Sequence, residues 1–156
     1  ARHGENVAAT RESERWFERA ISDYGSTSIN GQTLKELATP ELFELRHLTL
    51  GHRAPEMEGV DLEGHPMKLS DFRGNVVVIV FWCVHGSEAP TLRRLVERRS
   101  GRPLKILGVC GETDLAKATA EVEKERMTWP SFWDRRDGPI ARAWNVKGWA
   151  NFWVLD

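Results

Sequence analysis

The chain is short of cysteine, of net charge and of long apolar runs, and each shortage excludes a class of protein. Two cysteines among 156 residues are too few for a scaffold built on disulfides. Lys and Arg number 22 against 23 Asp and Glu, so no global field draws the chain to nucleic acid. No run of about 18 apolar residues occurs, and we therefore expect no membrane span. The 40% of hydrophobic residues fits one globular domain with a modest appendage.

Residues 75–90, NVVVIVFWCVHGSEAP, join a buried strand to a cysteine and then to a helix. The β-branched and aromatic run at 76–82 is typical of a central parallel strand that is covered on both faces. Cys83 stands where that strand should end, and a helical pattern opens at Pro90. In open α/β sheets, functional groups gather at the carboxyl ends of strands, near helix N-termini that stabilise thiolates. Cys83 is therefore a candidate functional thiol.

Residues 1–50 are predicted to form a helical appendage. An amphipathic helix is expected at 10–24, where Trp16, Phe17 and Ile21 share one face. A second helical stretch is expected at 34–48, broken near Pro40 because proline disrupts helix interiors. This appendage ends before Gly51, and from Ala54-Pro55 onward short strand and turn patterns replace the helical pattern.

The rest of the chain alternates strands and helices, which predicts an α/β domain with parallel strands at its centre. Strands are expected at 57–60, 67–69, 76–82, 104–110, 132–133 and 151–155. Helices are expected at 90–99, 113–126 and 139–146. Thr113 is the expected N-cap of the second of these helices.

Several motifs beyond residue 50 keep a fixed order and spacing. They are GHRAP at 51–55, DLEGHPMKLSDFRG at 61–74, FW at 81–82, LGV at 107–109 and WNVKGW at 144–149. In this order they resemble the redoxin branch of the thioredoxin superfamily, a bacterial group that includes thiol–disulfide oxidoreductases and thiol-specific antioxidant proteins. The resemblance implies a thioredoxin-like α/β fold over 51–156. It also implies a C-terminal truncation, because the family continues with a hairpin strand and a helix that this chain lacks.

The chain departs from the family pattern at the positions that carry the chemistry. The family places Cys-x-x-Cys after the strand, whereas the tetrad here is Cys83-Val84-His85-Gly86, with glycine in the place of the resolving cysteine. The family also sets a cis-proline opposite the cysteines, where this chain has Ala150. Cis bonds are essentially a proline property, so we expect a trans bond before Ala150.

The resemblance assigns Cys83 as the attacking thiolate. His85 and the following helix are candidates for lowering its pKa, with an ordinary loop residue as the alternative for His85. Cys110 ends the neighbouring strand and is a candidate resolving thiol, with plain core packing as the alternative. Trp82, Trp149 and Ala150 would line a substrate groove, with packing in the core and its rim as the alternative for the two tryptophans. Cys83 and His85 supply only two metal ligands, and neither a metal nor a cofactor is expected.

Two functions stay open at this point. The resemblance implies a thiol–disulfide oxidoreductase or antioxidant that acts on protein or small-molecule thiols or on peroxides. The alternative is an inactive member that keeps the fold as a peptide-binding or interaction module, because fold does not transmit activity when site residues change. The resemblance also implies an extracytoplasmic location, periplasmic or membrane-anchored.

Overall fold

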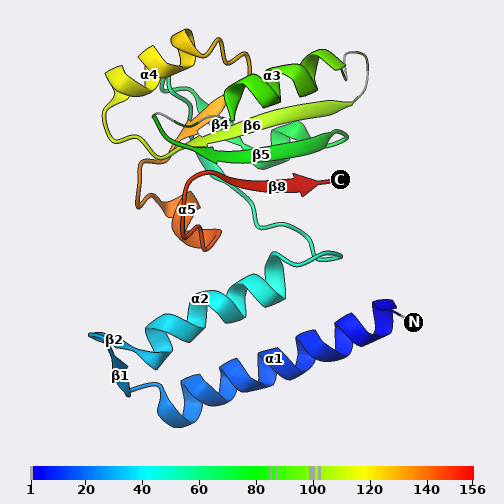
Figure 1. Cartoon of the computed structure of the whole chain (residues 1–156), viewed down its shortest axis with the longest axis vertical. Coiled ribbons are helices and arrows are strands. Elements are labelled where there is room, and N and C mark those ends of the chain that lie inside the picture. Colours follow the sequence, from blue (N-terminus) through cyan, green and yellow to red (C-terminus); the bar gives the residue numbers. More distant parts are fainter. Residues whose placement is uncertain (1, 85, 87, 99–100, 102) are drawn as a thin grey trace. The chain divides into compact units, whose positions relative to one another are not determined.

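Two units make up the chain, Ala1–Pro55 and Glu56–Asp156. The computed structural model describes residues 2–84, 86, 88–98, 101 and 103–156. His85 and Ser87 thus lie outside the described residues. Figure 1 shows the elements of both units in chain order.

The first unit is a pair of helices joined by a short hairpin. Helix α1 covers Arg2–Tyr24, strands β1 and β2 cover Ser28–Ile29 and Gln32–Thr33, and helix α2 covers Leu34–His47. The first helix thus begins earlier than expected. Arg46 of α2 forms an ion pair with Glu14 of α1 at 3.8 Å.

Helix α2 runs through Pro40 without interruption, so the expected break there is wrong. A capping box fixes the start of the helix: the Glu36 N–H donates to Thr33 Oγ1, and the Thr33 N–H donates to Glu36 Oε2. Ala38 and Leu42 bury their side chains on either side of the proline. Burial and capping together outweigh the one backbone hydrogen bond that proline removes.

A four-stranded sheet is the centre of the second unit, in the order β7-β6-β5-β8. Strands β5 (Val76–Trp82), β6 (Leu104–Cys110) and β7 (Ser131–Trp133) run parallel, and β8 (Asn151–Leu155) is antiparallel to β5. The strands expected at 76–82, 104–110 and 151–155 are confirmed to the residue. All three are rich in β-branched, aromatic and other apolar residues, and β5 is an unbroken apolar run, which is why the sequence defines them well.

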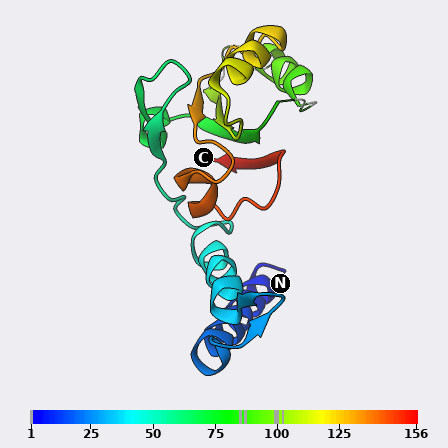
Figure 2. The ribbon, with the colours of Figure 1, turned by 90° about the vertical axis from the view of Figure 1, so that its left-hand side faces the viewer.

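Helices cover both faces of this sheet. Figures 1 and 2 show α3 (Ala89–Arg98) and α4 (Leu115–Lys124) on one face and α5 (Pro139–Ala143) on the other. The helices expected at 113–126 and 139–146 are therefore shorter at their ends than the sequence indicated. Among the described residues, no helix has the length and apolarity needed to cross a bilayer.

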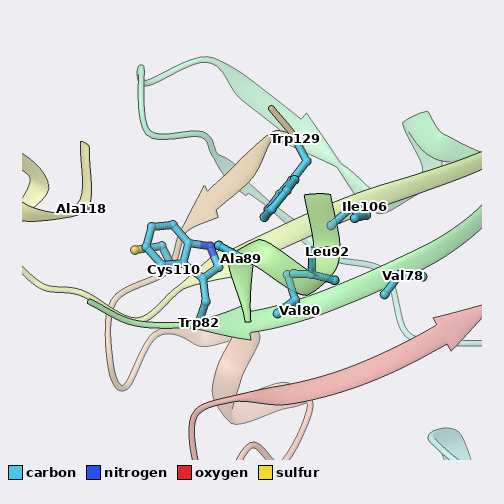
Figure 3. Close-up of a cluster of buried hydrophobic side chains, with 9 residues drawn as sticks. All are labelled: Val78, Val80, Trp82, Ala89, Leu92, Ile106, Cys110, Ala118 and Trp129. Atoms are coloured by element: carbon cyan, nitrogen blue, oxygen red, sulfur yellow. The ribbon is translucent and has the colours of Figure 1, made fainter. Parts of the chain in front are cut away.

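The face below α3 and α4 holds one continuous hydrophobic cluster (Figure 3). It combines alternate residues of β5 and β6 with small and apolar residues of the two helices. Its buried members are Val78, Val80, Trp82, Ala89, Leu92, Ile106, Cys110, Ala118 and Trp129. Cys110 is thus a core residue.

An aromatic cluster fills the opposite face. Trp144, just after α5, is 1% exposed and lies 6.3 Å from Phe81 and 5.6 Å from Trp153, measured between ring centroids. Phe81 is in β5 and Trp153 is in β8, so Trp144 joins α5 to both strands.

The N-cap of α4 is Asp114 and not Thr113 as expected. Its carboxylate accepts the N–H groups of Ala116 at 3.0 Å and of Lys117 at 3.3 Å. Both residues are good N-caps, and the sequence alone does not separate neighbours of that kind.

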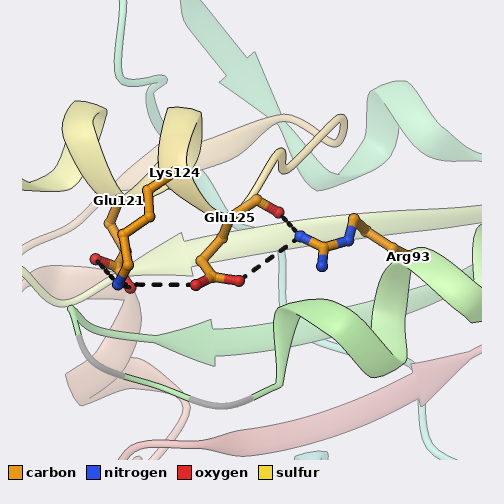
Figure 4. A network of polar contacts seen from close by, with 4 residues as sticks. All are labelled: Arg93, Glu121, Lys124 and Glu125. Carbon is orange, nitrogen blue, oxygen red and sulfur yellow. Dashed lines mark hydrogen bonds and ion pairs between the residues drawn. The ribbon is translucent and has the colours of Figure 1, made fainter.

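An ion-pair network links α3 to α4 (Figure 4). Arg93 of α3 donates to the backbone carbonyl of Glu125 and lies 3.6 Å from its carboxylate. Lys124 bridges Glu125 at 3.7 Å and Glu121 at 3.1 Å. This network fixes α3, the helix that follows Cys83, against its neighbour.

A short hairpin precedes the sheet. Strands β3 (Glu58–Val60) and β4 (Pro66–Lys68) pair antiparallel, which confirms the expected strands on either side of the 61–64 turn. A 3-10 turn, η1 (Leu69–Phe72), leads from the hairpin toward β5.

The buried carboxylate of Asp134 anchors the start of α5. It accepts the N–H groups of Ile140 at 3.0 Å and of Ala141 at 2.7 Å. We expect Asp134→Ala to lower the free energy of unfolding by about 2–3 kcal/mol, because both donors would stay buried without an acceptor. Urea denaturation measures the change. Asp137→Ala, at an exposed position nearby, is the control, and equal stability of the two variants would contradict this role.

Candidate functional site

Cys83 lies at the end of the sheet where the carboxyl ends of the parallel strands meet, an edge that runs across β5, β6 and β7. It directly follows Trp82, whose backbone pairs with Cys110 at the end of β6. Strand β7 ends at the same edge with Trp133, which pairs with Cys110 from the other side. Cys83 is half-buried, whereas Cys110 is fully buried. Cys83 is therefore the one cysteine with solvent access.

A small pocket opens beside Cys83. Its polar lining comes from Cys83, Gly86 and Glu88, and apolar side chains such as Leu92 and Trp129 form its wall. The interior has room for about one water molecule. The indole N–H of Trp129 is buried and has no acceptor within the described part of the chain.

The backbone turns tightly after Cys83. The Gly86 N–H donates to the Cys83 carbonyl oxygen at 3.2 Å, which closes a turn over 83–86. A Cβ built on Gly86 would collide with Oε2 of Glu88. The Glu88 carboxylate thus fills the space that the side chain of a second cysteine would take.

The pKa of Cys83 is raised, whereas the sequence predicted a lowered one. Partial burial raises it most, the Glu88 carboxylate raises it next, and Glu112 adds a smaller increase. Arg136 acts in the opposite direction. Whether His85 contributes lies outside the described residues.

Cys110 is poorly placed to react. Burial raises the pKa of its thiol to about 12. The Trp82 indole belongs to the same buried cluster, where its N–H donates to Ser131 Oγ at 3.2 Å. Trp82 itself is only 3% exposed, so it supports the site from the core. The resolving role of Cys110 stays a prediction that its burial opposes.

Trp149 and Ala150 lie just before β8. The Trp149 ring packs on Gly111, where a Cβ would collide with it, and its centroid is 6.2 Å from that of Phe81. The peptide bond between Trp149 and Ala150 is cis, so the expected trans bond is wrong. Our expectation came from residue type alone.

No pattern in the sequence indicates which charged groups surround Cys83 in the fold. Glu88 is visible only as an acidic residue ahead of a helix, and Glu112 and Arg136 are far from Cys83 in the chain. The turn after Cys83 brings Glu88 close, and the pairing of β5 with β6 and of β6 with β7 brings Glu112 and Arg136 to the same end of the sheet. In the described ranges, no group of three or more His, Cys, Asp or Glu residues is placed to hold a metal ion.

Comparison with known families shows to which family the chain belongs. The family model described as AhpC/TSA family matches residues 50–155, about two thirds of the chain. The chain belongs to the AhpC/TSA family. The redoxin resemblance in the sequence motifs is thereby confirmed.

The AhpC/TSA assignment agrees with a curated relative. The thiol-disulfide oxidoreductase ResA of Geobacillus kaustophilus is 30% identical over 116 residues, which cover 70% of this chain. The match spans 64% of that protein, slightly less than two thirds of its length.

Solved structures confirm the thioredoxin-like fold of this AhpC/TSA member. The thioredoxin domain of a Bacteroides vulgatus thiol-disulfide oxidoreductase matches with a TM-score of 0.63 at 23% identity, covering 69% of this chain and 81% of that one. A secreted Mycobacterium tuberculosis disulfide oxidoreductase matches with a TM-score of 0.55 at 22% identity, covering 62% and 72%.

Proposed function

We propose that residues 51–156 carry out thiol–disulfide exchange through a single attacking thiol, Cys83, and that residues 1–50 are an appendage. The observation that carries this proposal is the position of Cys83: it is solvent-accessible, at the carboxyl end of β5, beside a pocket. Membership of the AhpC/TSA family supports thiol chemistry at this edge. The name of the relative favours disulfides over peroxides as substrates.

The reaction needs two exchanges. The Cys83 thiol first loses its proton to solvent, and the thiolate attacks one sulfur of a substrate disulfide. A bond forms from Cys83 to that sulfur while the substrate S–S bond breaks, and the leaving thiolate takes up a proton. A second, external thiol then attacks the mixed disulfide and returns Cys83 to the reduced state. The external thiol is required because Gly86 supplies no sulfur.

The raised pKa of Cys83 makes this a slow reaction at neutral pH, because only the thiolate attacks. Trp149, packed on Gly111 next to this edge, and Ala150 would contact the substrate chain. His85 would modulate the pKa of the Cys83 thiol.

Trapping of a mixed disulfide tests the proposal. We expect the protein to form a covalent adduct with insulin or a small disulfide, seen as a mass increase, and expect Cys83→Ser to form none. Addition of a small thiol should release the adduct. An unreacted Cys83, or an adduct that persists in Cys83→Ser, would refute single-thiol exchange.

A second function is favoured by the same raised pKa and by Gly86. Both suit a non-catalytic module that binds peptides at the edge near Trp149. Peptide binding that is equal in the protein and in Cys83→Ser, without any exchange, would favour this function.

We further propose an extracytoplasmic location, periplasmic or membrane-anchored. The secreted state of the Mycobacterium tuberculosis protein supports it. Fractionation of cells that express the full-length protein is the direct test.

A further inference from the structure

We propose that Glu88 makes the Cys83 site selective for substrates that carry positive charge next to the reacting sulfur. This inference rests on the proposed exchange at Cys83 and names the substrate class that the site prefers. It starts from the position of one carboxylate.

The Glu88 carboxylate belongs to the lining of the Cys83 pocket. Glu88 and Cys83 line the same pocket, and Oε2 of Glu88 stands directly over Gly86, within the turn that Cys83 begins. A substrate sulfur that approaches Cys83 from this pocket therefore comes close to this carboxylate. Among the described residues that line the pocket, Glu88 is the one acidic side chain. A charge on the substrate next to the reacting sulfur therefore interacts with Glu88 there.

The other charged groups that act on Cys83 do not cancel the negative charge of Glu88. Glu112 follows β6 at the same edge, and hydrogen bonds from the backbone N–H groups of Asp114 and Thr113 lower its pKa. Arg136, after β7, is the opposing cation. The neighbouring Arg135 lies over the Trp133 ring, 5.2 Å from its centroid. Among the described residues, two carboxylates and one guanidinium thus act on the thiol.

A cationic substrate would also activate the thiol that it meets. Glu88 is the largest electrostatic cause of the raised pKa of Cys83. A positive charge placed beside Glu88 offsets that effect, so the thiolate fraction rises while the substrate is bound. An anionic substrate would add to the repulsion and keep Cys83 protonated.

Disulfides of different charge test the selectivity. The reagents are cystamine, a dication, 2-hydroxyethyl disulfide, which is neutral, and dithiodiglycolate, a dianion. The second-order rate of mixed-disulfide formation is measured by intact mass at low salt. Each rate is divided by the rate of the same reagent with urea-unfolded Cys110→Ser, in which Cys83 is again the one reactive thiol; this removes the intrinsic difference between the leaving thiols.

We expect the normalised rate to be highest for cystamine, intermediate for the neutral reagent and lowest for the dianion. The rates for cystamine and the dianion should differ about ten-fold at low ionic strength. Glu88→Gln should reduce this ratio to about two- to three-fold, and added salt should reduce it in the unaltered protein. Arg136→Gln should increase it. Glu97→Gln removes the same charge from an exposed position on α3 and should leave the ratio unchanged.

The outcomes distinguish a failure of the proposed role of Glu88 from a failure of the proposed exchange at Cys83. Equal normalised rates for all three reagents, or a ratio that Glu88→Gln and Glu97→Gln change alike, would overturn the role of Glu88 while exchange at Cys83 stands. No adduct with any reagent would instead overturn the proposed function, and the selectivity with it.

Discussion

The Gly86→Cys variant is expected to form an intramolecular disulfide with Cys83 under mild oxidant. The hydrogen bond from the Gly86 N–H to the Cys83 carbonyl closes a turn, which keeps the two Cα atoms within about 7 Å. Disulfides span Cα separations of about 4.4–6.8 Å. The backbone at Gly86 is not in the left-handed region, so a side chain is accepted there. The Glu88 carboxylate must move aside, and as the end of a flexible side chain it can do so.

The same variant should reduce insulin disulfides at least about ten-fold faster than the unaltered protein. The second thiol would act at an effective concentration in the millimolar range, so release of the mixed disulfide no longer waits for an external thiol. Turbidity of the released insulin chains measures the rate. Gly86→Ser, with similar volume and no thiol, is the matched control. A variant that forms dimers through Cys83 and gains no activity would show that the tetrad geometry is not that of a dithiol site.

Trp144→Ala is expected to cost about 3–5 kcal/mol in the free energy of unfolding. Trp144 is 1% exposed and contacts Phe81 of β5 and Trp153 of β8, so its loss opens a cavity on the α5 face of the sheet. Strand β8 would then lose a main contact with the core. Chemical denaturation followed by circular dichroism measures the change.

Two further variants keep this expectation testable if Trp144→Ala does not fold. Trp144→Phe retains an aromatic ring and should lose less stability. Trp16→Ala, at a tryptophan that is 60% exposed in α1, should change stability by about 0.5 kcal/mol or less. A similar loss in Trp144→Phe and Trp16→Ala would contradict the central packing role of Trp144.

Much of the fold follows from local patterns in the sequence. Strand β5 is a continuous apolar run and β6 is apolar apart from Lys105 and Gly108, as expected of strands in a sheet covered on both faces, and both were predicted to the residue. The motifs from Gly51 onward identified the redoxin branch, which the family match confirms. The hairpin of β3 and β4 followed from its turn residues.

The remaining features depend on contacts that the sequence does not encode locally. Helix α2 continues through Pro40 because burial around it outweighs a lost hydrogen bond. Asp134 reaches its partners on α5 across several residues, and no local pattern marks it. The raised pKa of Cys83 arises from burial and from Glu88 in a turn whose shape only the folded chain defines. A lowered pKa was the natural expectation for a thiol ahead of a helix.

Labelling of the folded protein with iodoacetamide across pH tests the account most directly. We expect one label per chain, lost in Cys83→Ser, because Cys110 is fully buried. The labelling rate should keep rising beyond the ordinary thiol pKa of about 8.5, since burial and Glu88 raise the pKa of Cys83. A rate that levels off near neutral pH, or a label that remains in Cys83→Ser, would contradict the account.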